Sequence, residues 1–382
     1  MTSGHVWVDP QVPRLVDSIH GIPSIAFEFR PAASTEGAAV AVRSALKGVF
    51  TKLDWLENPA PLAFPGVELL PGGCLLVFDY VDNEHLFSMF LTHLVYELEQ
   101  AGCSGAFLPP PGVRLAIDMP QKKEACLTGG LAFDVDLATI NALPREVARS
   151  GWYVSAELTN RVLDNVMDWL SAIDGATWYY TTSGHNVSIL PGQARDLIVR
   201  SLPDNSSTAL TATTHEQFRR VQFASVGHVT FEIGNVRDDW EADLATLVDV
   251  LRAGAADARF GFVRRCVAPQ PSWRSSLFWI RPFPLVSENY YGRSPGVESS
   301  YVPDVYGVQL LHPAHMKRTG DLAGWHVEEL ASGHFLVSAL DPFAWFEGGA
   351  PNDETLTAAR RDFGEAIMDD ELIEKHAYLD LT

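Results

Sequence analysis

The chain has 382 residues, 47% of them hydrophobic, and its 48 Asp and Glu against 28 Lys and Arg give a formal net charge of −20. This charge repels phosphate backbones and anionic lipid surfaces, so neither nucleic acid nor a membrane is expected as a partner. The chain shows no signal-peptide pattern, no stretch near eighteen uninterrupted apolar residues and no closely spaced cysteines, which predicts a cytoplasmic protein with reduced thiols.

The first third of the sequence predicts two helices among several strands. Residues 24–30 (SIAFEFR) alternate apolar and polar side chains, as a half-buried strand does. The spacing of apolar residues predicts a helix over 34–53, and a Pro-Gly-Gly turn then precedes an apolar strand at 74–80. A second helix is expected from Asp82 or Asn83 through Leu98, followed by a strand at 113–118.

The middle of the sequence repeats this alternation. We expect a strand at 152–158 (WYVSAEL), an amphipathic helix from Thr159 to Ala172, strands around TWYYTT and NVSIL, and a short helix opened by Pro191. Further on, residues 226–234 and 258–266 read as strands that flank a helix capped by Asp238 or Asp239. An acidic amphipathic helix is expected after Asp353.

Together these segments predict an α+β fold of two or three strand–helix–strand units with mainly antiparallel sheets. The predicted units are an N-terminal unit at 1–125, a middle unit at 126–221 and a C-terminal unit at 222–382 with an acidic terminal helix. Residues 68–77 and 329–337 each read as a strand, a glycine turn and an apolar strand. Whether the N- and C-terminal units are duplicates stays open, because any β-hairpin has this pattern.

No residue pattern predicts catalysis, a cofactor or a metal site. The chain has no GxSxG, SxxK or GxxxxGK[ST] sequence and no dinucleotide fingerprint. The histidines His312, His315, His326 and His334 form the richest group of titratable side chains. Pro313 is expected to begin a helix and to leave His312 outside it, so these histidines are interpreted as surface or capping residues. Trp169 and Trp240 lie at helical core spacing and are interpreted as packing residues.

Residues 269–303 are rich in proline, serine and aromatic side chains, and are too apolar for a flexible linker. Tyr, Trp and Arg outside a core pattern are typical of protein-binding hot spots. The alternative, a loop packed into its own domain, stays open. The residues predicted to bind a partner are Trp273, Trp279, Tyr290, Tyr291, Arg293 and Tyr301, together with the acidic Asp238 and Asp239.

The last hundred residues carry a family resemblance. They contain Tyr290-Tyr291-Gly292, the run 305–311 (VYGVQLL), the run 325–330 (WHVEEL), the Gly333 turn and Asp341-Pro342-Phe343 before a closing helix. This order of elements resembles immunity proteins of bacterial polymorphic-toxin and type VI secretion systems. The resemblance implies an α+β inhibitor without cofactor that occludes a toxin. It carries over no catalytic residue, and the first 200 residues have no counterpart in it.

The expected function is therefore stoichiometric binding of another protein, a basic toxin, by an immunity protein, and enzymatic activity is not favoured. Two alternatives are kept: an enzyme of unfamiliar class with a site near the C-terminal histidines, and a scaffold or phage-related assembly component. Fold alone does not decide among them. An enzyme should show a pocket with converging polar groups, whereas a binder should show a broad acidic and aromatic face.

Overall fold

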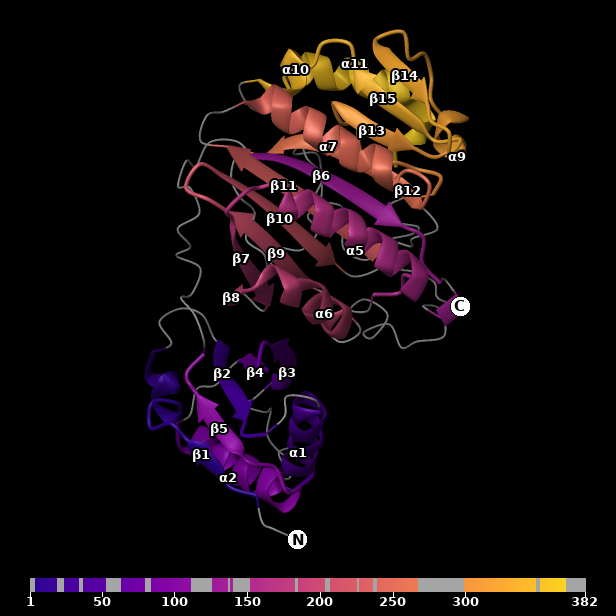
Figure 1. The fold of residues 1–382 in the computed structure, drawn as a ribbon. Helices are drawn as coiled ribbons and strands as arrows, with labels where there is room; N and C mark the ends of the chain where they lie inside the picture. Colours follow the sequence, from indigo (N-terminus) through magenta and orange to yellow (C-terminus); the bar gives the residue numbers. More distant parts are fainter. Residues whose placement is uncertain are drawn as a thin grey trace. The chain divides into compact units, whose positions relative to one another are not determined.

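The computed structural model describes most of the chain (Figure 1). The described ranges are 4–18, 24–33, 37–52, 63–79, 84–110, 126–136, 138–139, 152–182, 185–202, 207–224, 227–235, 239–266, 299–347 and 351–368. The chain divides into two compact units, one of Met1–Leu115 with His185–Ser201, the other of Ala116–Gly184 with Leu202–Thr382. The predicted α+β class with mainly antiparallel sheets is confirmed.

A five-stranded sheet forms the centre of the first unit. Its strand order is β1 (Val6–Val8), β5 (Gly105–Leu108), β2 (Ser24–Pro31), β4 (Gly73–Asp79) and β3 (Ala63–Leu70). Only the β1–β5 pair is parallel; the others are antiparallel. The helices are α1 (Ala38–Lys52), α2 (Glu84–Gln100) and the short 3-10 helix η1 (Pro13–Ser18). The predicted strand at 113–118 lies outside the described residues.

Phenylalanine side chains fill the core of this unit. Phe27 of β2 stacks on Phe78 of β4 with ring centroids 5.6 Å apart, and Phe87 of α2 meets Phe27 edge-on at 5.8 Å. Phe107 of β5 completes the cluster, and all four rings are fully buried or nearly so. Burial of a large apolar side chain contributes about 1.5–3 kcal/mol, so this cluster is a main source of the unit's stability.

A ten-stranded antiparallel sheet is built from strands that lie between residues 126 and 339. Its strand order is β14 (Trp325–Glu329), β15 (Phe335–Ala339), β13 (Val308–Leu311), β12 (Ala258–Cys266), β6 (Cys126–Phe133), β11 (His228–Asn235), β10 (Gln217–Ala224), β9 (Ser207–Thr213), β7 (Thr177–Thr182) and β8 (His185–Ile189). The helices that follow or interrupt these strands are α5 (Ala156–Ser171), α6 (Pro191–Ser201), α7 (Trp240–Gly254), α9 (Pro313–Met316), α10 (Phe343–Phe346), α11 (Asp353–Phe363) and the 3-10 helix η5 (Gly364–Ala366).

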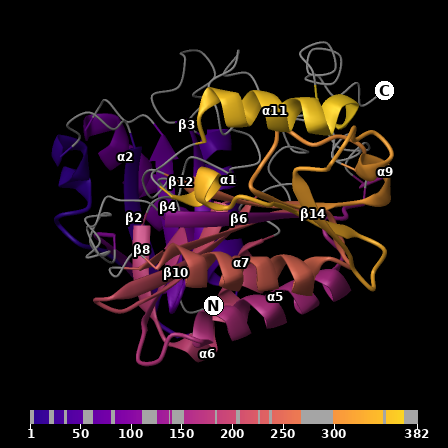
Figure 2. The same cartoon turned by 90° about the horizontal axis from the view of Figure 1, so that it is seen from above.

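Two of these helices lie side by side on one face of the sheet. Figure 2 shows α5 and α7 next to each other, with α11 on the opposite side. Small residues let α7 approach β6 and β12 closely. A Cβ atom at Gly254 would stand 2.6 Å from Leu131, and one at Gly261 would stand 3.0 Å from Leu251. A larger residue at either position would force these leucine side chains to shift.

One predicted element differs in type. The segment 152–158 was expected to be a strand, but α5 begins at Ala156 and residues 152–155 are irregular. Ser155 is the N-cap of α5, and its hydroxyl accepts a hydrogen bond from the Leu158 backbone N–H at 3.2 Å. The alternation of this segment therefore reflects a capping sequence, which serine favours.

The predicted unit boundaries at residues 125 and 221 stay predictions. The ten-stranded sheet takes strands from both sides of residue 221, because β6 lies between β11 and β12. The predicted 68–77 and 329–337 hairpins are both present, as β3–β4 and β14–β15. Gly72 and Gly333 have φ values of 90° and 79° in their turns, which explains why glycine stands at both.

Candidate functional site

Most of the residues predicted to bind a partner lie outside the described part of the chain. These are Trp273, Trp279, Tyr290, Tyr291, Arg293 and Asp238. Asp239 and Tyr301 are described, and they lie on different elements. The partner-binding role of the loop at 269–298 therefore stays a prediction.

Asp239 has a structural role at the start of α7. Its carboxylate accepts a hydrogen bond from the Ala242 backbone N–H at 3.2 Å, which makes it the N-cap predicted from the sequence. The residue is also exposed. A carboxylate at a helix N-terminus interacts favourably with the positive end of the helix dipole. Asp239 thus fixes the start of α7 and places negative charge on the surface beside it.

Tyr301 packs within its own unit. Its ring is half-buried, and the guanidinium of Arg318 lies 4.5 Å from the ring centroid. This cation–π contact occupies one face of the ring. A partner could contact only the part of the Tyr301 ring that Arg318 and the surrounding residues do not cover.

The outer side of α7 carries an apolar groove. Trp240, Leu244 and Val248 follow one another at intervals of four residues, so they form one stripe along the helix. With Pro342 they line a groove of about 360 Å³, which we call the α7 groove. Phe343, beside Pro342, is 51% exposed.

Aromatic rings hold the start of the α7 groove in place. The Trp240 ring lies edge-on to Phe343, with centroids 5.4 Å apart, and stacks on Phe346 at 6.1 Å. The first turn of α7 is thereby joined to α10. Trp240 is only half-buried, so part of its indole faces solvent. A rigid, partly exposed tryptophan is the residue type that most often dominates a protein interface.

Acidic side chains surround the α7 groove. Glu241 and Asp249 line it directly, and Asp239 stands at its end. Among the described residues, Arg252 is the one arginine that lines the groove, and it donates to Asp249 at 3.2 Å and to Glu328 of β14 at 2.9 Å. The hydrogen bond that Arg252 donates to Glu328, opposed by partial desolvation, raises the pKa of Arg252. Its positive charge is compensated by two carboxylates, so the groove presents a negative surface.

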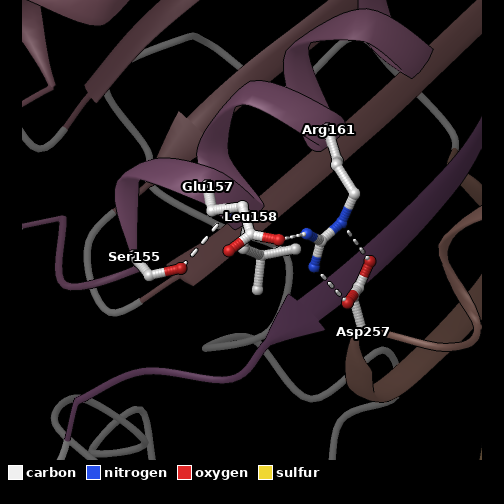
Figure 3. Close-up of polar contacts among 5 residues, drawn as sticks. All are labelled: Ser155, Glu157, Leu158, Arg161 and Asp257. Carbon is white, nitrogen blue, oxygen red and sulfur yellow. Dashed lines mark hydrogen bonds and ion pairs between the residues drawn. The ribbon is translucent and has the colours of Figure 1, made fainter.

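An ion-pair network ties α5 to the end of α7 (Figure 3). Arg161 donates to Glu157 one turn earlier at 2.7 Å and to both carboxylate oxygens of Asp257 at 2.8 and 3.2 Å. Hydrogen bonding to Asp257 raises the pKa of Arg161. Asp257 follows directly after α7, so this contact sets the spacing between the two helices.

The C-terminal histidines form a helix cap. His312 is the N-cap of α9, as the position of Pro313 predicted. Its Nδ1 accepts from the Ala314 N–H at 3.2 Å, and His315 Nδ1 accepts from the His312 N–H at 3.0 Å. Desolvation and the nearby His334 lower the pKa of His312. Within the described residues, no group of three or more His, Cys, Asp or Glu side chains is placed to hold a metal ion.

The sequence interpretation missed the α7 groove, although it named Asp239 at the end of the groove as a partner-binding residue. Trp240 was interpreted as a packing residue because it has helical core spacing. The structure shows that it both packs on α10 and lines a surface groove. The missing information was the position of Pro342 and Phe343, which are about 100 residues away in the sequence. Periodicity along one helix does not reveal such a long-range neighbour.

Comparison with known proteins adds no family assignment. No protein-family model, no curated protein and no solved structure matches this chain. Among the helices that the structure describes, none has both the length and the apolar character needed to span a bilayer.

Proposed function

We propose that this chain is a stoichiometric protein-binding protein of the cytoplasm, an immunity protein that neutralises a basic toxin by covering it. The observation that carries the proposal is the α7 groove, where Trp240, Leu244 and Val248 form an apolar stripe with acidic neighbours. Interface cores combine aromatic anchors with a polar rim, and this surface has both. The α7 groove, whose residues the structure describes, is therefore the contact to be tested first.

Charge and apolar contact have separable effects in such an interface. The net charge of −20 and the carboxylates beside the groove would attract a basic partner and speed its encounter. The indole of Trp240 would bury its exposed part against the partner and slow dissociation. Salt screens the electrostatic attraction and therefore slows association, whereas it leaves the apolar contact of Trp240 and the dissociation rate nearly unchanged.

The test uses the protein encoded by the reading frame next to this chain's gene as the candidate partner. Purified full-length chain should bind it with 1:1 stoichiometry in isothermal titration calorimetry and should abolish its toxicity when both are expressed together. Raising ionic strength from about 0.05 to about 0.5 M should slow association severalfold in surface plasmon resonance, with little change in dissociation. Equal association rates at both salt concentrations would contradict the electrostatic part of the proposal.

Two substitutions locate the contact. Trp240→Ala should speed dissociation about 30-fold, which corresponds to about 2 kcal/mol. Glu241→Lys should mainly slow association, because it reverses an exposed charge. Trp7→Ala is the matched control, since Trp7 is 48% exposed and belongs to the other unit. Thermal melting of each variant separates a binding defect from unfolding. A folded Trp240→Ala variant with unchanged kinetics would exclude the α7 groove as the contact.

A further inference from the structure

A second pocket lies on the other side of α7. It is a crevice of about 350 Å³ between α5 and α7, which side chains from β6, β10 and β11 also line. Its apolar wall is formed by Leu131, Phe133, Val162, Phe231 and Val250. We call it the α5–α7 crevice. Its volume falls in the range of small-molecule sites, which begins at about 300 Å³.

Two buried N–H donors that line this crevice have no acceptor among the described residues. They are Nε1 of Trp169 and Nε of Arg219. Trp169 is 8% exposed, and its ring meets Phe231 edge-on at 5.4 Å, so its position is fixed. A buried donor without an acceptor costs about 1–3 kcal/mol. Two such donors in one pocket indicate that an acceptor from outside the chain belongs there.

The guanidinium of Arg219 is hydrogen-bonded on one side and, within the described part of the chain, lacks hydrogen-bond acceptors on another. Its Nη1 donates to the Trp169 carbonyl at 2.6 Å, and the guanidinium lies 5.1 Å from the centroid of the Trp169 ring. The Nε–Nη2 edge makes no hydrogen bond to the described residues. Desolvation lowers the pKa of Arg219, and the negative charge of Asp243 opposes this effect only in part. The arginine is thus a partly desolvated cation whose donors are incompletely satisfied.

We propose that the α5–α7 crevice binds a small carboxylate with an apolar body. A carboxylate placed along the Nε–Nη2 edge of Arg219 would form the bidentate pair that guanidinium groups favour. The indole N–H of Trp169 would supply a further donor, and the apolar body would lie against Leu131 and Phe231. Asp168 and Asp249 also line the crevice and are exposed. They favour a ligand whose outer end is neutral or cationic and disfavour a dicarboxylate.

The test compares two probes of nearly the same shape, a carboxylate with two acceptor oxygens and its neutral amide with one. We would titrate full-length protein with 4-fluorophenylacetate and with the neutral 4-fluorophenylacetamide, and follow the fluorine signal by NMR. The acid should bind saturably and at least tenfold more tightly than the amide. Trp169→Phe keeps the ring and removes the N–H, and Arg219→Lys keeps the charge and removes the bidentate edge. Each should weaken acid binding about tenfold, whereas Arg200→Gln, at an exposed arginine on α6, should bind as the wild type does.

Three results would overturn the proposal: no saturable binding up to about 20 mM acid, equal binding of acid and amide, or unchanged binding in a folded Trp169→Phe variant. Thermal melting shows whether Arg219→Lys is folded. If it is not, Trp169→Phe decides alone. Trp240→Ala should leave acid binding unchanged, because Trp240 does not line this crevice. Failure here would therefore be distinguishable from failure of the α7 groove as a protein contact.

Discussion

The ion pair between Asp304 and Arg360 joins α11 to the segment before β13. Removing Arg360 should lower the free energy of unfolding by more than removing Asp304. Arg360 donates to the two carboxylate oxygens of Asp304 at 2.9 and 2.7 Å. One of those oxygens also accepts from the Val305 N–H at 2.9 Å. The Asp304 side chain is 3% exposed, whereas that of Arg360 is 24% exposed. Hydrogen bonding to Asp304 raises the pKa of Arg360.

The loss of stability in each variant depends on how deeply the remaining charged side chain is buried. Arg360→Ala leaves a buried carboxylate whose remaining hydrogen-bond partner among the described residues is the Val305 N–H. An uncompensated buried charge costs about 3–5 kcal/mol. Asp304→Ala leaves a guanidinium that water can partly reach, so its cost should be smaller, about 2–3 kcal/mol. The double variant should lose less than the sum of the single variants, with a coupling energy of about 2 kcal/mol.

Urea denaturation followed by tryptophan fluorescence measures these differences. The ring centroid of Trp325 lies 4.9 Å from that of Phe363 of α11 and 5.8 Å from that of Trp345, so two of the ten tryptophans that give the signal lie in the region that the ion pair holds. The two units can unfold in separate steps, and the change is expected in the step that Trp325 reports. The reasoning is refuted if the two single substitutions are additive, or if Asp304→Ala costs more than Arg360→Ala.

Two further predictions concern the cap of α9 and the packing of α10. The pKa of His312 is lowered below its usual 6.5 in the folded state, so the unfolded chain binds more protons in acid and stability should fall as pH drops below about 6.5. His312→Asn keeps a capping side chain and should make the unfolding free energy less dependent on pH between 7 and 5; an unchanged slope would contradict this. Gly307→Ala should cost about 1–3 kcal/mol, because its Cβ would stand 2.7 Å from Phe346 and 2.8 Å from Trp345. A melting temperature equal to that of the wild type would show that these rings move aside freely.

The sequence predicted correctly those helices and strands that are specified by capping residues or side-chain alternation within a few residues. Asp239 caps α7 as expected, and the strands on either side of α7 were placed correctly. The strand at 152–158 was wrong because alternation there concealed the Ser155 cap. The strand β6 was not predicted, since Gly129 and Gly130 weaken a strand pattern.

The candidate sites were harder to predict because long-range contacts form them. The α7 groove depends on Pro342, and the α5–α7 crevice combines side chains from β6, α5, β10, β11 and α7. The sequence analysis interpreted Trp169 as a packing residue and did not single out Arg219, which lies on β10, a strand that was not predicted. A ligand is suggested only by their proximity in the folded chain, where the N–H groups of Trp169 Nε1 and Arg219 Nε have no acceptor among the described residues.

The position of β6 also has a consequence for synthesis of the chain on the ribosome. Both neighbours of β6 in the sheet are made much later, since residue 126 pairs with residue 266, which follows it by 140 residues. At about 5–20 residues per second, β6 waits roughly 7–28 s before its second edge is covered. During that interval α5 and the β9–β10 hairpin can form from sequence that is already available. The central strand of the sheet is thus translated first, and its second edge stays uncovered until β12 has been made. Pairing of strands so far apart in the sequence is expected to slow folding.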